Sequence, residues 1–136
     1  MSTFSIEEYV RWSDVDAAGI LCYGAYVRFV EVAETELFRA MGMPYGQIFD
    51  RFDCWLPRVH FAGDFHLPAR LDEKLTVRPF VKRIGTTSVT LGFAIDNAAG
   101  KRVADFEMVL VCIDRATFGK RPLPDELRRS LADYRT

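Results

Sequence analysis

The stretch SDVDAAGILCYGAYVRFVEVAETELFRAMG, from Ser13 to Gly42, decides how this chain folds. In its second half, apolar residues recur at steps of three and four, which predicts a long amphipathic helix that ends near Gly42. The apolar positions of this helix are Tyr26, Phe29, Val30, Ala33, Leu37 and Met41. In its first half, Asp14 and Asp16 stand where an extended segment turns into the helix. The stretch therefore predicts a turn that presents carboxylates at the start of the main helix.

The flanking segments predict strands and one short helix. FSIEEYVRW (4–12) is rich in β-formers and predicts a first strand, and Pro44 opens a short helix through YGQIFDRF. WLPRVHFAGDFHLP (55–68) reads as extended, with Gly63 as a bulge or a close backbone approach. Further strands are predicted at KLTVRPFVKRI, TTSVTLGFAI and VADFEMVLVCID, the last two joined by a hairpin turn at DNAAGK. The sum is a single α+β domain over residues 1–136, an antiparallel sheet wrapped on a central helix.

Composition excludes several function classes. The 136 residues carry a net charge of −1 and no basic block, so nucleic-acid binding is not expected. The longest apolar run is far shorter than the ~20 residues of a membrane span, and the amino terminus lacks a signal-peptide pattern. Three widely spaced cysteines form no CxxC pair and only two histidines occur, so we expect no metal site. Reduced thiols in a cytoplasmic protein are the natural interpretation.

Asp16 has a structural and a catalytic interpretation. As a turn or capping residue, its carboxylate accepts backbone N–H groups. As a catalytic residue, it would act beside a helix amino terminus, whose unpaired N–H groups stabilise a developing oxyanion. A thiolate leaving group, with a thiol pKa near ~8.5, departs without a strong general acid. The turn and helix start are therefore suited to thioester hydrolysis, and no convincing Ser-His-Asp set is present.

The same residues resemble a known signature. The D-x-D-x-x-G pattern of Asp14, Asp16 and Gly19, followed by apolar and aromatic residues and a long helix with glutamates, resembles the 4-hydroxybenzoyl-CoA thioesterase family. The resemblance covers nearly the whole chain, including LPRVHFAGDFHLPARLDEKLTV and KRPLPDELRRSL, and implies the hot-dog fold of that family. FDCWLPRVHFAGDF and KRPLP are similar to segments of 1,4-dihydroxy-2-naphthoyl-CoA hydrolases, which implies an aromatic acyl group.

By this resemblance, Asp16 is the catalytic acid, either as nucleophile or as general base for a water. The backbone N–H of Tyr23 would bind the thioester oxygen, and Gly19 would allow the tight turn ahead of the helix. Many relatives that act on short acyl chains have histidine where Tyr23 stands, and many members have asparagine where Ala25 stands. The candidate substrate-binding residues are Trp12, Tyr26, His60 and Trp55.

The resemblance also implies the partners. The substrate would be an acyl-CoA, so coenzyme A arrives with the substrate and no separate cofactor is expected. The active sites would lie between subunits of a homodimer, which pairs further into a dimer of dimers, a homotetramer.

Other carboxylates and other functions remain open at this point. Glu31 and Glu34 are interpreted as a solvated or salt-bridged helix face, with Glu31 as the reserve catalytic acid. Cys22 is interpreted as a buried, inert thiol rather than a nucleophile. The alternative functions are a hot-dog dehydratase or hydratase, and a non-catalytic module that binds acyl thioesters.

Overall fold

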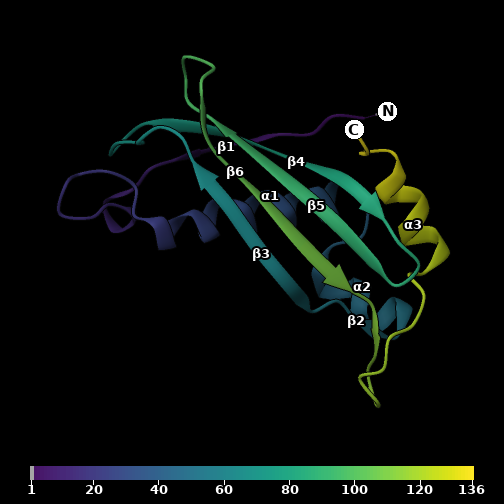
Figure 1. Ribbon diagram of the computed structural model, residues 1–136. Helices are drawn as coiled ribbons and strands as arrows, with labels where there is room; N and C mark the ends of the chain where they lie inside the picture. The colour runs from purple at the N-terminus through teal and green to yellow at the C-terminus, as the bar shows by residue number, and fades with distance from the viewer. Residues whose placement is uncertain (1) are drawn as a thin grey trace.

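The computed structural model describes residues 2–136, in which one antiparallel sheet curves around one long helix (Figure 1). The strand order is β1-β4-β5-β6-β3. Every neighbouring pair is antiparallel. The strands are β1 (Ile6–Tyr9), β3 (Arg58–Phe65), β4 (Lys74–Ile84), β5 (Ser88–Asp96) and β6 (Arg102–Val111). The predicted α+β architecture is confirmed.

Helix α1 (Tyr26–Ala40) follows a short 3-10 turn at Tyr23–Ala25 and packs its apolar face against the sheet. Its buried side chains are Tyr26, Phe29, Val30, Ala33, Glu34, Leu37 and Phe38. The central strand β5 supplies the opposite side of the core through the buried Leu91, Phe93 and Ile95. The apolar period of three and four therefore identified most of the buried face. Glu34 and Phe38 are buried without having been predicted, and Met41, the C-cap residue, is only half-buried.

Smaller elements gather at one end of the sheet (Figure 1). Helix α2 (Tyr45–Phe52) leads into β2 (Cys54–Trp55), which pairs with β7 (Ile113–Asp114). Helix α3 (Asp125–Ala132) packs against β4 near the carboxyl terminus (Figure 1). No helix within residues 2–136 has both the length and the apolar character needed to cross a membrane.

One sequence prediction differs from the structure in detail, and the structure decides between the two alternatives of another. The first strand is shorter than predicted, because the Asp14 carboxylate accepts the Arg11 N–H at 2.7 Å and closes a 3-10 turn at Trp12–Asp14. The bulge in β3 lies at Arg58 rather than at Gly63. Gly63 instead allows a close approach, since a Cβ there would lie 2.2 Å from the Phe106 ring.

Strand β3 is an edge strand with an unusual surface. All eight of its residues are exposed, in contrast to the largely buried β5. Its large apolar side chains Val59, Phe61 and Phe65 are 61%, 43% and 55% exposed. The edge of the sheet beside α1 therefore exposes large apolar side chains, and no further strand within residues 2–136 pairs with it.

Candidate active site

Asp16 lies in a tight hairpin just ahead of α1. Its N–H donates to the Ile20 carbonyl at 2.9 Å, and its own carbonyl accepts the Gly19 N–H at 2.9 Å. Gly19 has a φ of +77°, a left-handed conformation that glycine adopts without strain. The carboxylate of Asp16 accepts the Ala18 N–H at 2.8 Å and is otherwise exposed. The glycine is therefore needed for the turn that presents Asp16.

The start of the helix supplies unpartnered amides next to this hairpin. The first helical hydrogen bond runs from the Ala25 N–H to the Cys22 carbonyl at 2.9 Å. The amides of Tyr23 and Gly24 precede the first intrahelical donor, so the helix itself offers them no acceptor. Within residues 2–136, no other carbonyl or side chain accepts them. They form a small group of free donors at the positive end of the helix dipole.

Asp16 and the helix start line the same cavity. It has a volume of about 410 Å³ and is lined by Asp16, Ile20, Leu21, Tyr23, Tyr26, Phe65, His66, Leu67 and Pro68. Tyr26 is buried beneath it, with its ring 5.1 Å from that of Phe65 and 5.6 Å from that of Phe106. Burial, with a smaller contribution from the charge of Glu73, raises the pKa of Tyr26. This Asp16 pocket thus joins a carboxylate, free amides and an apolar aromatic wall.

The neighbouring acid, Asp14, has a different environment. Its buried carboxylate accepts Arg28 Nε at 3.0 Å and Arg28 Nη2 at 2.5 Å. Burial alone would raise the pKa of Asp14, but the hydrogen bonds from Arg28 and from the Arg11 amide outweigh burial and lower it. Asp14 is therefore an ionised, fully bonded structural residue.

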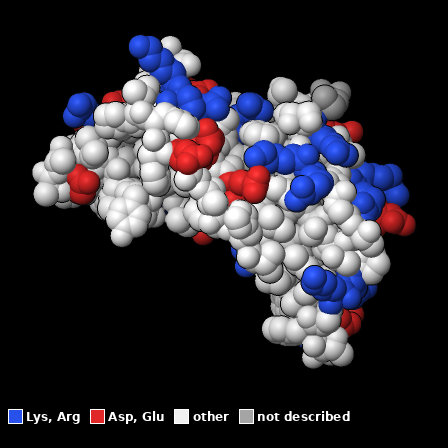
Figure 2. Space-filling view, in the orientation of Figure 1, with Lys and Arg blue, Asp and Glu red and all other residues white. Residues whose placement is uncertain are grey.

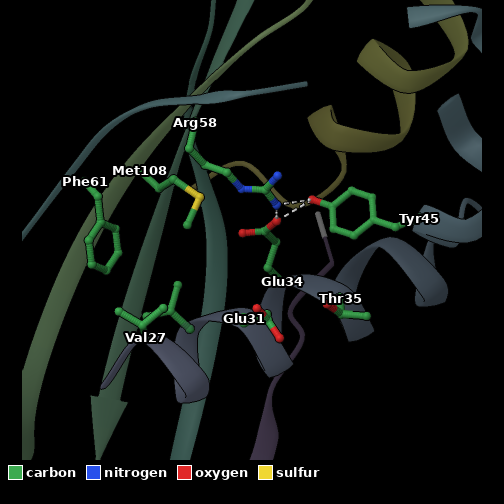
Figure 3. Close-up of a pocket in the computed structure, with 9 residues that line it drawn as sticks. Val27, Glu31, Glu34, Thr35, Tyr45, Arg58, Phe61 and Met108 are labelled. Carbon is green, nitrogen blue, oxygen red and sulfur yellow. Dashed lines mark hydrogen bonds and ion pairs between the residues drawn. The ribbon is translucent and has the colours of Figure 1, made fainter. Parts of the chain in front are cut away.

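A second cavity, of about 490 Å³, lies farther along α1 (Figure 3). Glu34 is only 2% exposed here and pairs with Arg58 of β3, while the Tyr45 hydroxyl donates to Glu34 Oε1 at 2.5 Å. The remaining lining residues are Val27, Val30, Glu31, Thr35, Phe61 and Met108. Of the two predicted environments, Glu34 is salt-bridged and not solvated, because Arg58 and Tyr45 arrive from distant segments and make its burial possible.

Burial shifts the pKa values of two residues that line this Glu34 pocket. Burial lowers the pKa of Arg58, and the nearby Glu31 carboxylate opposes that shift. Burial raises the pKa of the Tyr45 hydroxyl, which therefore stays protonated and donates to Glu34. Glu31 is exposed at the rim. Arg39, on the same helix, bonds Glu36 at 3.2 Å.

Three predicted binding residues lie away from the Asp16 pocket in this chain. Trp12 is 80% exposed. Trp55 borders a separate apolar hollow at the start of β3, with Arg115 stacked 4.3 Å above its ring. His60 Nε2 lies 3.4 Å from Glu107 Oε2, on the outer face of the sheet. Only Tyr26 of the predicted substrate-binding residues lines the pocket together with Asp16 and Tyr23.

The outer face of the sheet lies in front of α1 in Figure 1, and Figure 2 shows basic and acidic side chains beside one another in the same orientation. Lys82 Nζ lies 2.8 Å from Glu107 Oε1, and Arg102 Nε lies 2.5 Å from Asp96 Oδ1. His66 belongs partly to this face, because its Nε2 lies 2.8 Å from Asp105 Oδ2. These contacts pair Lys82, Arg102 and His66 each with a neighbouring acid.

Sequence reasoning missed part of each cavity. Phe65, His66 and Leu67 join the Asp16 pocket because β6 holds the end of β3 beside the helix start, through the His66 N–H to Val103 carbonyl bond of 2.8 Å. Arg58 and Tyr45 meet Glu34 only in the folded chain. The printed sequence offers no local signal for either meeting, apart from the extended character of 55–68.

The cysteines behave as free thiols. Cys54 and Cys112 are buried, and Cys22 is half-buried. Burial, together with the neighbouring Cys54, raises the pKa of Cys112 to about 12, so this thiol is unreactive near neutral pH. Across residues 2–136, no group of three or more potential metal ligands comes together.

Residues 10–131 match the Thioesterase-like superfamily. The chain belongs to this superfamily. The acyl-CoA thioester hydrolase YbgC of Escherichia coli is 27% identical over 118 residues, which cover 87% of each chain. The 1,4-dihydroxy-2-naphthoyl-CoA hydrolase of Nostoc punctiforme is 27% identical over 125 residues, which cover 92% of this chain and 84% of the relative.

Solved structures agree with this membership. The crystal structure of a 1,4-dihydroxy-2-naphthoyl-CoA thioesterase from Synechocystis matches with a TM-score of 0.89 at 24% identity, and the match covers 97% of both chains. The hot-dog fold is thereby confirmed, and so is the prediction that this chain belongs to the thioesterase enzymes. The roles of individual residues stay predictions.

Proposed function

We propose that this protein hydrolyses an aromatic acyl-CoA to the free acid and coenzyme A, with the Asp16 carboxylate as general base or nucleophile. One observation carries the proposal: the Asp16 carboxylate shares an apolar pocket with the start of α1, where the Tyr23 and Gly24 amides have no acceptor within residues 2–136. A carboxylate supplies the nucleophile or base, and free amides supply the oxyanion site.

In the general-base route, Asp16 takes a proton from a water whose oxygen bonds the thioester carbon. The carbonyl π electrons move to oxygen, and the resulting oxyanion accepts the Tyr23 N–H. When the carbonyl re-forms, the C–S bond breaks and coenzyme A leaves as a thiolate, which takes up the proton. No separate general acid is required, because the thiol pKa is near ~8.5.

In the nucleophilic route, an Asp16 oxygen bonds the thioester carbon directly and expels the thiolate. The mixed anhydride is then cleaved by water, which releases the acid and restores the carboxylate. A single turnover in ¹⁸O-water identifies the nucleophilic route where water attacks the Asp16 carbonyl of the anhydride, since that step places label in the protein; attack at the acyl carbon, like the general-base route, labels only the product. Mass spectrometry of the peptide that contains Asp16 gives the readout.

An aromatic acyl group is supported by the rings around the pocket and by the relatives. Tyr23, Tyr26 and Phe65 border the Asp16 pocket. Rings stack on aromatic walls with a gain of about 0.5–1.5 kcal/mol beyond area burial. Two of the similar proteins carry names that specify 1,4-dihydroxy-2-naphthoyl-CoA, a bicyclic aromatic thioester. We therefore place aromatic acyl-CoAs ahead of short-chain ones.

A homodimer through β3 follows from the exposed edge of the sheet. Antiparallel pairing of β3 with its copy about a two-fold axis would cover the unpaired edge and the apolar Val59, Phe61 and Phe65. The Asp16 pocket lies at the Phe65 end of β3 and the Glu34 pocket at the Arg58 end. The axis would bring one protomer's Asp16 pocket beside its partner's Glu34 pocket. A dimer of dimers and a cytoplasmic location stay predictions.

The experiment that tests the function is a thiol-release assay over benzoyl-CoA, acetyl-CoA and palmitoyl-CoA, read with a chromogenic thiol reagent. We expect the highest kcat/KM with benzoyl-CoA. Water addition to crotonyl-CoA without thiol release would support the hydratase alternative instead. Thermal stabilisation by benzoyl-CoA with no thiol released from any substrate would support a non-catalytic module.

A further inference from the structure

Asp14 occupies the junction between the Asp16 hairpin and helix α1. We propose that Asp14 and Arg28 are positioning residues that hold Asp16 at a fixed place relative to the Tyr23 amide. This inference rests on the proposed function, because it assigns to the pair the geometry that Asp16 and the amide need. Neither residue lines the Asp16 pocket, so neither is expected to touch substrate.

The side chain of Asp14 is fixed by three donors. Arg28 reaches one oxygen with Nε at 3.0 Å and the other with Nη2 at 2.5 Å, and the Arg11 N–H reaches Oδ2 at 2.7 Å. A two-point bond between a guanidinium and a carboxylate restricts orientation as well as distance. The Asp14 side chain is only 4% exposed, so water competes weakly with these bonds.

The backbone of Asp14 connects this clamp to both reacting groups. Its carbonyl accepts the Cys22 N–H at 2.8 Å, immediately before Tyr23, and Asp16 follows two residues after Asp14. Val15 and Leu21 form the next antiparallel bridge of the hairpin. A shift of Asp14 would therefore move the carboxylate and the oxyanion donor by different amounts.

Arg28 is itself restrained from two other elements. Its Nη1 lies 3.2 Å from Glu8 Oε2, and its Nη2 donates to the Tyr9 carbonyl at 3.1 Å, both on β1. Its guanidinium also lies 4.5 Å from the centre of the Phe29 ring. One side chain thus joins the first strand, the hairpin and the helix. Misplacement of a catalytic group by about 1 Å costs about 100-fold in rate.

The test is a double-mutant cycle on benzoyl-CoA hydrolysis. Asp14→Asn and Arg28→Lys should each lower kcat about 10- to 100-fold while KM changes less than about threefold, because binding surfaces are untouched and alignment is lost. Arg28→Lys keeps the positive charge but removes the two-point guanidinium contact with Asp14. It therefore remains informative if Asp14→Asn fails to fold. Each variant is assayed well below its own melting temperature.

The decisive arm repeats both substitutions in the Asp16→Asn background. A residue that acts only by placing Asp16 and the amide should lower kcat less than about threefold there, since the group that it aligns is gone. An equal loss in both backgrounds, or wild-type kcat in Asp14→Asn and Arg28→Lys, would overturn the inference. Full activity of Asp16→Asn alone would instead refute the proposed function.

The exposed pair of Glu36 and Arg39 on the same helix provides the matched control. These side chains are 41% and 59% exposed and also form a carboxylate–guanidinium contact, at 3.2 Å. Glu36→Gln and Arg39→Lys should leave kcat and KM within about twofold of wild type. If these control substitutions lowered kcat as much as Arg28→Lys does, then any change of a charged pair on α1 would lower activity. That result would contradict the inference.

Discussion

At the scale of single residues, Asp14 and Asp16 have different environments and different proposed roles. Asp14 is buried and bonded on both oxygens, whereas Asp16 is exposed and faces the Asp16 pocket. Sequence reasoning placed both acids at the turn from local chemistry. It separated them only through the family resemblance, because the burial of Asp14 depends on Arg28, fourteen residues away.

The lowered pKa of Asp14 predicts a pH-dependent contribution to stability. The folded state holds the Asp14 proton more weakly than the unfolded state does, so the stabilisation is present above the ordinary pKa of 3.8. It is lost as the pH falls through the lowered folded-state value. Asp14→Asn should reduce the free energy of unfolding by about 1–3 kcal/mol at neutral pH.

Urea unfolding at neutral pH and at several acidic values checks this prediction. The difference between wild type and Asp14→Asn should shrink as the pH is lowered past the ordinary pKa of 3.8. A difference that stays constant throughout that range would mean that ionised Asp14 does not stabilise the fold.

At the scale of elements, helices α1 and α2 were predictable because their signals are local. The apolar period, Gly42 and Pro44 each lie within a few residues of the helix that they predict. The predicted short helix coincides with α2, Tyr45–Phe52. The Glu34 pocket was not predictable in the same way, since its partners come from α2 and β3 and only the tertiary fold brings them together.

Two glycines should respond in opposite directions to alanine. A Cβ on Gly63 of β3 would lie 2.2 Å from the Phe106 ring and 2.7 Å from the Asp105 carbonyl oxygen, so Gly63→Ala should destabilise by about 1–3 kcal/mol. Gly46 in α2 has nothing within 4 Å of such a Cβ, so Gly46→Ala should stabilise by about 0.5 kcal/mol. Thermal unfolding of both variants measures the two signs, and a Gly63→Ala protein as stable as wild type would contradict the close packing of β3 on β6.

The Glu34 cluster should contribute measurably to stability. Glu34→Gln leaves Arg58, whose side chain is 40% exposed, without its carboxylate; because solvent screens this side chain in part, the change should cost about 1–3 kcal/mol. Tyr45→Phe removes one hydrogen bond to that carboxylate and should cost about 1–2 kcal/mol. Glu31→Gln, at the exposed rim, should change the free energy of unfolding by less than about 0.5 kcal/mol. If Glu31→Gln and Glu34→Gln lowered the free energy of unfolding equally in chemical denaturation, the contact between Glu34 and Arg58 would not stabilise the fold.

At the scale of the whole molecule, the apolar edge of β3 is the feature that one chain leaves uncovered. The sequence itself indicates, through apolar residues on both faces of the strand at 103–114, that both faces of this strand are covered. It could not show that β3 is the open edge, because strand order depends on which strands pair, and hydrophobic pattern alone does not specify that.

Substitutions on the two edge strands test the predicted dimer. Val59→Lys on β3 should place a charge in the interface, convert dimer to monomer and reduce thioesterase activity. Tyr9→Lys on the opposite edge strand, at a side chain that is 50% exposed, should leave the assembly state unchanged. Sedimentation velocity gives the readout, and a Val59→Lys protein of unchanged mass would exclude β3 as the interface.

The central claim is that the Asp16 carboxylate drives thioester cleavage in a pocket whose oxyanion site is the start of α1. The most direct measurement is kcat for benzoyl-CoA hydrolysis by Asp16→Asn, beside Asp133→Asn, an exposed acid at the end of α3. We predict a loss of at least about 100-fold for Asp16→Asn with an unchanged melting temperature, and wild-type kcat for Asp133→Asn. Wild-type kcat in Asp16→Asn would contradict the account.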